Sequence, residues 1–360
     1  SGSHLMSLFS HAPESICILR LSAIGDCVHT VAVVQAIQRQ WPQTRITWIM
    51  GKVEAMLLGD LPGIEVIPFD KKLGWRGYRQ VWRQLKGRRF DALLHMQSAL
   101  RASLLSLGIR ATHKLGFDAQ RAGDGQRWFT NHAVPSPASP HVLDGLMAFA
   151  AELGITDREA HWQIPTSPAD DAWASTHLDN TRPTLVIAPA ASKAYKNWTV
   201  AGYAALADHA AACGFQVLLC GGPTPLERQM ASEIMALCQH QPGNLIGQTS
   251  LKQLMALIKQ AQLVLAPDTG PTHMATAAGV PVIGLYAHHN PERTGPYRCR
   301  DWVVSVYQQL MEAHTGRPLA ELPWRSRLKD PDAMQQITPQ QVIDQFNAIT
   351  QAHGLLKDPA

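Results

Sequence analysis

A repeating pattern of short apolar runs, each followed by an amphipathic stretch, constrains the fold of this chain more than any other feature. Apolar runs of about four to eight residues are typical of buried strands, and longer amphipathic stretches are typical of the helices that connect them. The alternation predicts βαβ units that build a parallel sheet. In the first half we expect strands at 16–21, 45–50, 64–69, 91–96 and 114–117 and helices at 28–41, 75–85, 99–107 and 141–153, with a further short helix between the second and third strands.

The same pattern starts again after a polar stretch at 165–182. Here we expect strands at 184–188, 215–220, 263–266 and 280–286 and helices at 200–212, 225–238, 251–260 and 271–278. A chain of 360 residues exceeds what one hydrophobic core usually supports, and its 46% hydrophobic content suffices for two. We therefore predict an α/β protein with two Rossmann-like, doubly wound domains facing a central cleft, at 7–175 and 176–335. A separate helix in 336–360 begins with Thr338 as its N-cap.

Several classes of protein are disfavoured by what the sequence contains. Residues 1–6 have the sequence of a cleaved expression tag, so Met6 is the expected native start. The six cysteines show neither a CxxC pair nor zinc-ligand spacing, which predicts reduced thiols and a cytoplasmic protein. No apolar run reaches the roughly 18 residues of a membrane span. No GxGxxG fingerprint follows a predicted strand, and the net charge of +4 is low for a nucleic-acid-binding protein.

The strongest local signal is the loop after the predicted strand at 263–266, followed by a helix with Pro271 near its start. Free backbone N–H groups and the positive end of a helix dipole bind an anion, typically a diphosphate. Asp268 and His273 flank the anion position, where they would contact ribose or sugar hydroxyls. In the alternative interpretation, Asp268 only caps the helix. The candidate donor-binding residues here are Asp268, Thr269, Gly270, Pro271, Thr272 and His273.

Two further loops follow strands of the same predicted sheet. The first carries Ser192, Lys193 and Lys196, and its lysines reach phosphate oxygens as point charges. The second carries Gly222 and Glu227, whose carboxylate at a helix start would accept ribose hydroxyls. Taken singly, a loop lysine is usually solvated and a first-turn glutamate usually only complements the helix dipole. Their common position after three strands of one sheet favours a shared binding site.

In the first half, the first predicted strand ends at a glycine turn that contains Gly25 and Asp26. The turn places Asp26 at the mouth of the cleft, where a carboxylate would take a proton from an attacking hydroxyl. An N-cap role is the alternative for Asp26. His29, about one turn later, is a second candidate base or a polar neighbour.

The segment 71–89 contains eight basic residues and no acidic one. Helical spacing predicts a cationic stripe along one face and an apolar, aromatic stripe beside it. Such a helix suits an anionic amphiphile, although most charge runs are only solvated faces. The stripe consists of Lys72, Arg76, Arg79, Arg83 and Lys86, and the first four are candidate acceptor-binding residues.

These segments resemble the lipopolysaccharide heptosyltransferases of glycosyltransferase family 9. The resemblance rests on residues 18–30 (ILRLSAIGDCVHT), 196–198 (KNW), 221–227 and 268–273 (DTGPTH) with the helix that follows, in the family's order. It implies a GT-B fold whose C-terminal helix crosses back to the N-terminal domain. It also implies an inverting, metal-independent and cofactor-free transfer of a heptose from ADP-L-glycero-D-manno-heptose to the Kdo (3-deoxy-octulosonate) or heptose residues of the lipopolysaccharide inner core.

The resemblance also assigns roles and partners. It implies Asp26 as base, Lys196 on the donor phosphate or sugar, Glu227 on the nucleoside, Asp268 on the sugar and the backbone of 269–272 on the phosphates. The basic helix would bind an anionic Kdo-lipid A acceptor, and the enzyme would lie peripherally on the cytoplasmic face of the inner membrane. The stretch 95–101, with Gln97 and Arg101 as further acceptor candidates, follows the family pattern only loosely.

Two alternatives belong to other functional classes. A sugar-nucleotide epimerase of GT-B fold also has two Rossmann-like halves, but it needs no acceptor site, so the basic aromatic helix argues against it. A non-catalytic nucleotide- or polyanion-binding protein would use Asp26 only structurally.

Overall fold

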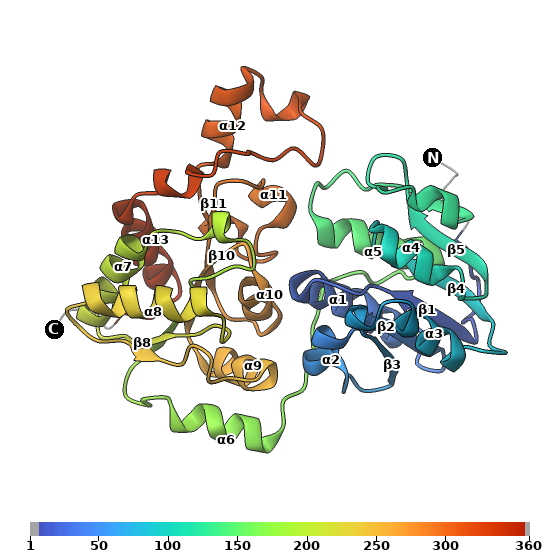
Figure 1. Ribbon diagram of the computed structural model, residues 1–360, viewed down its shortest axis with the longest axis horizontal. Helices are drawn as coiled ribbons and strands as arrows, with labels where there is room; N and C mark the ends of the chain where they lie inside the picture. The colour runs from blue at the N-terminus through green and yellow to red at the C-terminus, as the bar shows by residue number, and fades with distance from the viewer. Residues whose placement is uncertain (1–6, 357–360) are drawn as a thin grey trace. The chain divides into compact units, whose positions relative to one another are not determined.

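The computed structural model describes residues 7–356, which divide after Pro165 into two compact units, 7–165 and 166–356. The expected tag and the expected native start at Met6 lie outside the described residues. The first unit is built on a parallel sheet with strand order β3-β2-β1-β4-β5-β6 (Figure 1). Its strands are β1 (Ser15–Leu19), β2 (Arg45–Gly51), β3 (Ile64–Phe69), β4 (Phe90–His95), β5 (Ala111–Phe117) and β6 (His132–Val134). The order reverses at β1, which makes the carboxyl ends of β1 and β4 the switch point of a doubly wound sheet.

Helices cover both faces of this sheet. They are α1 (Ile24–Gln40), α2 (Lys52–Leu58), α3 (Trp75–Gln84), α4 (Leu100–Ser106) and α5 (Val142–Leu153), with 3-10 turns η2 (Lys71–Leu73) and η3 (Gln126–Phe129). Right-handed crossovers that run in opposite directions from β1 place α1 and α2 on one face and α3 and α4 on the other. Val81 of α3 and Leu105 of α4 accordingly share a core with Cys17 and Leu93 of the central strands.

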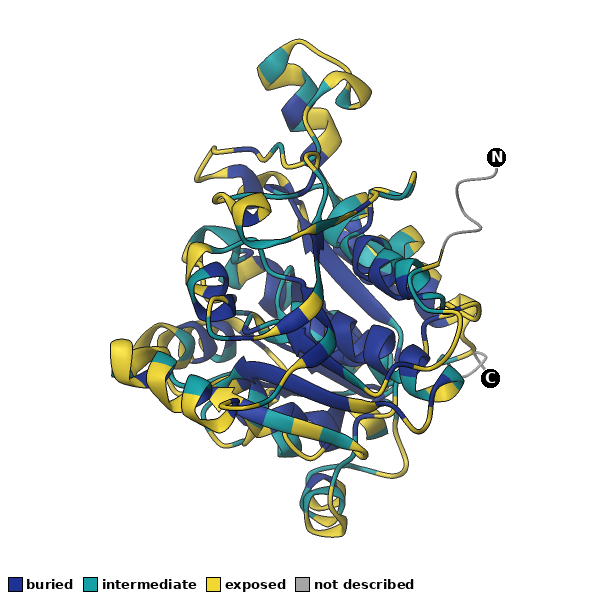
Figure 2. Cartoon of the chain, turned by 90° about the vertical axis from the view of Figure 1, so that its right-hand side faces the viewer, coloured by how far each residue is buried: buried dark blue, intermediate teal, exposed yellow. Residues whose placement is uncertain are grey.

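The second unit is a parallel sheet with strand order β12-β11-β10-β7-β8-β9. Its strands are β7 (Thr184–Ile187), β8 (Gln216–Leu219), β9 (Gly243–Asn244), β10 (Leu263–Pro267), β11 (Val282–Tyr286) and β12 (Val304–Ser305). β7 and β10, at the centre, are wholly buried and apolar apart from Thr184, as strands covered on both faces require. Figure 2 shows strands coloured as buried, in dark blue, among helices that carry both buried and exposed residues.

The helices of this unit complete the α/β layering. They are α6 (Pro168–Thr176), α7 (Val200–Ala212), α8 (Pro225–Leu237), α9 (Leu251–Gln260), α10 (Gly270–Ala277), α11 (Pro291–Thr294), α12 (Tyr307–Thr315) and α13 (Pro339–Ala352), with 3-10 turns η4 (Ala194–Lys196), η5 (Arg300–Trp302), η6 (Leu319–Glu321) and η7 (Ala333–Gln336). α12 and its flanking loops project away from the sheet of the unit (Figure 1).

The division of the chain lies after Pro165, whereas the sequence pattern suggested residue 175. The reason is α6, which packs against α9 and is tied to it by a hydrogen bond from Gln260 Nε2 to the carbonyl oxygen of Asp171, 3.0 Å. The helix expected after Thr338 is α13, capped by Thr338 in a capping box. Val342 and Phe346 of α13 are buried in the core of the second unit, so this helix helps to build that unit; its expected return to the first domain stays a prediction.

None of the helices within residues 7–356 is both long and apolar enough to cross a membrane.

Candidate functional site

The loops predicted to bind a donor all leave the carboxyl edge of the second sheet. β7 leads into η4, β8 into α8, and β10 into α10, and the three strands are neighbours in the order β10-β7-β8. α10 begins at Gly270 with Pro271 in its first turn, and its N-cap is Thr269, which makes no side-chain cap. The first backbone N–H groups of α10 are therefore not capped by that side chain, which is the geometry expected of an anion-binding turn.

Asp268 is not the cap of α10, so the capping interpretation of this residue is wrong. Its carboxylate instead collects polar partners from three other segments. Lys196 Nζ lies 3.5 Å from Oδ2, His273 Nε2 lies 3.6 Å from Oδ1, and Thr294 Oγ1 donates to Oδ2 at 3.5 Å. The Asp268 side chain is 16% exposed, so a charge there needs these partners.

These polar partners determine the direction in which the pKa of Asp268 is shifted. Burial alone would raise the pKa of Asp268, but the hydrogen bond from His273 and the positive charge of Lys196 lower it to about 2. Asp268 is thus a carboxylate at any physiological pH. It can accept hydrogen bonds from hydroxyl groups, as a sugar-binding side chain must.

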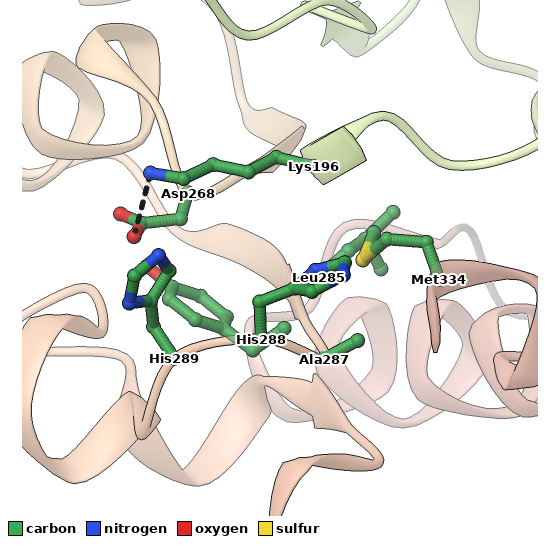
Figure 3. A pocket seen from close by; sticks show the side chains of 8 residues that line it. Lys196, Asp268, Leu285, Ala287, His288, His289 and Met334 are labelled. Carbon is green, nitrogen blue, oxygen red and sulfur yellow. Dashed lines mark hydrogen bonds and ion pairs between the residues drawn. The ribbon is translucent and has the colours of Figure 1, made fainter. Parts of the chain in front are cut away.

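A small, partly open pocket lies beside this ion pair (Figure 3). Figure 3 shows Lys196 reaching Asp268 from one side and the ring of His289 lying near the same carboxylate. The end of β11 and the residues after it supply much of the lining. The lining residues are Lys196, Asp268, Leu285, Tyr286, Ala287, His288, His289 and Met334.

The loop that carries Lys196 is held by its own anchors. Trp198 is buried and donates from Nε1 to the carbonyl oxygen of Ile337 at 2.9 Å, and the side-chain oxygen of Asn197 accepts from the backbone N–H of Ala191 at 2.8 Å. These contacts fix the loop on both sides of Lys196. The neighbouring Ser192 and Lys193 are exposed, so the structure brings Lys196 but not these two side chains to Asp268.

Glu227 forms a capping box with Thr224 at the start of α8. Its Oε2 accepts from Thr224 Oγ1 at 2.7 Å, and its Oε1 accepts from the backbone N–H of Gly222 at 2.9 Å. Glu227 therefore does interact with the start of its own helix, as the alternative interpretation predicted. These bonds hold the 222–227 turn in shape, and contact of Glu227 with a nucleoside stays a prediction.

In the first unit, Asp26 lies in the first turn of α1, whose N-cap is Ala23; the N-cap interpretation of Asp26 is therefore wrong. α1 begins at Ile24, immediately after the turn that follows β1. Arg20 Nη2 lies 2.9 Å from Asp26 Oδ2, and the same guanidinium donates to the carbonyl oxygens of Ser22 and Met96 at 2.8 and 2.7 Å. The Asp26 side chain is 39% exposed, so it is both oriented and accessible.

Gln97 reinforces the same turn. Its Oε1 accepts from the backbone N–H groups of Leu21 and Ser22 at 2.7 and 3.3 Å, and its Nε2 donates to Ser22 Oγ at 3.2 Å. Gln97 therefore shapes the loop that presents Asp26. Gly25 is buried in the first turn of α1.

His29, the second candidate base, is 1% exposed and its ring meets that of His141 edge to face, 5.6 Å between centroids. Such burial fits a polar neighbour better than a group that meets a substrate.

The expected cationic stripe is only partly helical, because α3 begins at Trp75 and ends at Gln84 and so leaves Lys72 outside the helix. Lys72 in η2, Arg76, Arg79 and Arg83 in α3, and Arg101 in α4 are all exposed.

Sequence reasoning missed residues whose role depends on contacts between segments. Arg20 orients Asp26, and a charged residue directly after an apolar strand was the available signal. Tyr286 donates from its hydroxyl to the carbonyl oxygen of Thr294 at 2.9 Å and so fixes the strand end beside the pocket. His289 follows β11, and only the fold brings it to Asp268. Among residues 7–356, no group of three or more His, Cys, Asp or Glu side chains has the spacing of a metal site.

Comparison with known proteins gives a consistent result. Residues 78–324 match the family model described as glycosyltransferase family 9 (heptosyltransferase). The lipopolysaccharide core heptosyltransferase OpsX of Haemophilus influenzae is 49% identical over 344 residues, 96% of this chain and 99% of the relative. Lipopolysaccharide heptosyltransferase 2 of Escherichia coli is 24% identical over 357 residues, 93% of this chain and 98% of the relative.

Solved structures agree in fold. A family 9 glycosyl transferase of Veillonella parvula superposes with a TM-score of 0.77 at 20% identity, covering 97% of this chain and all of that one. The E. coli heptosyltransferase WaaC, solved with ADP, gives 0.68 at 19% identity, covering 95% and 99%. The expected fold class, two Rossmann-like α/β domains of GT-B type, is confirmed.

Proposed function

Because the chain belongs to glycosyltransferase family 9, the heptosyltransferases, we propose that it transfers a heptose from ADP-L-glycero-D-manno-heptose to the Kdo or heptose residues of the lipopolysaccharide inner core. Transfer inverts the anomeric centre and needs neither metal nor cofactor. The observation that carries this proposal is the Lys196–Asp268 pair beside the start of α10. A cation, a carboxylate and free backbone N–H groups together match a diphosphate attached to a polyhydroxylated sugar.

On the donor side, the proposal divides the work between charges and backbone. The backbone of 269–272, through N–H groups such as those of Thr269 and Gly270, binds the diphosphate together with Lys196, and Asp268 accepts hydrogen bonds from sugar hydroxyls. When the bond between the anomeric carbon and the diphosphate breaks, negative charge grows on the departing ADP. Lys196 and the α10 N-terminus stabilise that charge, which is the contribution that a divalent cation makes in other enzymes. His273 supports the site by its contact with Asp268.

On the acceptor side, Asp26 takes the proton of the attacking hydroxyl. The hydroxyl oxygen then forms the new bond to the anomeric carbon from the face opposite the leaving ADP, so one glycosidic bond forms as one bond to phosphate breaks. The fork of Arg20 and the amide of Gln97 hold Asp26 and its turn in one geometry, which a general base requires.

An anionic glycolipid acceptor fits the surface that α3, α4 and η3 share. α3 and α4 are joined by the hydrogen bond from Trp82 Nε1 to the carbonyl oxygen of Leu105, 2.8 Å, and η3 packs beside α4. η2 and these three helices contain seven exposed basic residues and no acidic one: Lys71, Lys72, Arg76, Arg79, Arg83, Arg101 and Arg127. Trp75 and Trp128, 62% and 90% exposed, lie in α3 and η3.

Exposed tryptophans amid cations are typical of proteins that lie on an anionic membrane surface, because indole rings favour the headgroup layer. The proposal therefore places the enzyme peripherally on the cytoplasmic face of the inner membrane, with Lys72, Arg76, Arg79, Arg83 and Arg101 toward the acceptor's acidic groups. Vesicle sedimentation tests it. We expect binding to phosphatidylglycerol vesicles that Trp128→Ser weakens severalfold, while Leu237→Ser, at an exposed leucine of α8, leaves it unchanged. Equal binding to neutral vesicles, or no loss in the Trp128 variant, would contradict this placement.

The function is tested by incubating the enzyme with ADP-heptose, with and without Kdo-lipid A. Transfer consumes the donor and releases ADP only when the acceptor is present, and the acceptor gains one heptose by mass spectrometry. A parallel screen with UDP- and GDP-sugars tests the choice of nucleotide. Donor conversion without acceptor, or binding without turnover of either substrate, would refute the proposal.

A further inference from the structure

The pocket beside Asp268 is surrounded by more basic side chains than are required to neutralise its one carboxylate. Lys196 already pairs with Asp268, and His273 contacts the other oxygen of the same carboxylate. His288 and His289 then line the pocket directly after β11. Together with burial, the positive charge of Arg293, in α11, lowers the pKa of His289, and the positive charge of Arg327 lowers the pKa of His288. This excess of cations and imidazoles favours a ligand that brings several negative charges.

Both neighbouring imidazoles have a buried nitrogen without a hydrogen-bond partner among the described residues, Nδ1 in His288 and Nε2 in His289, but the His288 ring is anchored through its other nitrogen. Nε2 of His288 bonds to the backbone carbonyl oxygen of Asp330 at 2.7 Å, and its ring packs edge to face against Tyr195. His288 is therefore fixed in the wall. Nε2 of His289 is buried and has no hydrogen-bond partner among the residues that the structure describes. A buried polar atom without a partner is costly, and it is commonly satisfied when a ligand binds.

The groups that face His289 come from every segment around it. Lys196 lies on η4, Asp268 follows β10, Arg293 lies on α11, and His288 precedes it in the chain. Burial and the positive charges of Lys196 and Arg293 lower the pKa of His289 to about 4, against the opposing effect of Asp268. In the free protein the ring is therefore neutral at physiological pH. A second cation would be unfavourable there until an anion arrives.

We infer that His289 hydrogen-bonds the diphosphate of the nucleotide donor and takes up one proton from solvent when that diphosphate binds. The free ring nitrogen supplies the hydrogen bond, and the incoming negative charge removes the penalty against an imidazolium beside Lys196 and Arg293. No covalent bond changes in this step; one proton moves from water to the ring. The inference rests on the proposed function for the identity of the anion and adds a binding residue to that site.

The sign of the pH dependence follows from linkage. A group protonated in the complex but not in the free protein makes binding tighter as the pH falls. ADP affinity of the wild type should therefore rise from pH 8 to pH 6. The second ionisation of a phosphate group, with a pKa of about 6, also contributes, but equally for every variant. The difference between wild type and a His289 variant thus reports the imidazole.

Titration calorimetry with ADP, at pH 6 in two buffers of different ionisation enthalpy, tests the inference. We expect the wild type to take up close to one more proton per ADP than His289→Gln. The variant should bind ADP about tenfold more weakly at pH 6, with a smaller difference at pH 8. His288→Gln is the matched control and should retain the wild-type excess of proton uptake.

Different results would refute the proposed donor site and the proposed role of His289. If the wild type does not bind ADP, the proposed donor site fails. If the wild type binds ADP without excess proton uptake, or if His289→Gln matches it in affinity and uptake, the role of His289 is refuted. Loss of uptake in His288→Gln alone would assign the proton to His288 and overturn the inference. His289→Asn, checked by thermal unfolding, guards against a folding defect in a single variant.

Discussion

Replacing Lys196 by Met separates the electrostatic role of this lysine from its role in packing. Met has a similar length but no charge, so the loop anchors at Asn197 and Trp198 remain. At 3.5 Å and an effective dielectric constant of about 20, the gross attraction between Lys196 and Asp268 is about 5 kcal/mol. Desolvation of both groups offsets most of it. The depression of the Asp268 pKa, shared with His273, limits the net contribution of the lysine to about 1 kcal/mol.

The reaction should suffer far more than the fold. Removing one charge that stabilises a departing anion typically costs about 3 to 4 kcal/mol, or a factor of roughly 10² to 10³ in turnover. We therefore expect Lys196→Met to lower kcat/KM for heptose transfer by at least two orders of magnitude, while urea unfolding shows a loss of only about 1 kcal/mol. Lys259→Met, in α9, controls for the loss of a lysine elsewhere in the same unit. Turnover within threefold of wild type would show that the charge of Lys196 does not stabilise the leaving group.

Three further predictions follow from the same geometry. Arg20→Lys keeps the charge but loses the planar guanidinium that reaches Asp26, Ser22 and Met96. Heptose transfer should therefore slow by tenfold or more, while ADP affinity measured by calorimetry stays unchanged. Unchanged turnover would show that the guanidinium is dispensable. The lowered pKa of Asp268 contributes about 2 kcal/mol to the free energy of unfolding, which is present above roughly pH 4 and lost as the pH falls toward 2. The difference in unfolding free energy between the wild type and Asp268→Asn, measured with urea, should therefore become smaller from pH 5 to pH 3. A difference that does not change with pH would contradict this origin. Treatment with EDTA should leave transfer unchanged, whereas loss that a divalent ion restores would refute metal independence.

The alternation of apolar and amphipathic segments predicted both sheets because strands buried on two faces, such as β7 and β10, are continuous apolar runs. It could not predict β9 and β12, because a strand of two residues has no period to detect. The start of α1 was placed four residues late, since its first turn at Ile24 is glycine-containing and polar. No element was expected for α12, which projects from the sheet and buries few of its residues.

Part of the candidate site could likewise be predicted from the sequence, and part could not. Asp26, Lys196 and Asp268 could be found because each lies shortly after the end of a strand, at the edge where a parallel sheet binds ligands. Their partners could not, because Arg20, Thr294 and His289 act across segments that only the fold brings together. The sequence left a capping role open for both Asp26 and Asp268. The observed N-caps decide against both, because Ala23 lies three residues before Asp26 and Thr269 lies one residue after Asp268.

The most direct test of the account is the effect of Asp26→Asn on binding and transfer in parallel. The amide keeps the size of Asp26 but cannot accept the acceptor's proton, so a general base predicts a fall in turnover of two or more orders of magnitude. ADP affinity, measured by calorimetry on the same preparation, should be unchanged because the donor residues lie on the second sheet. Near-wild-type transfer of heptose to Kdo-lipid A by Asp26→Asn would contradict the account.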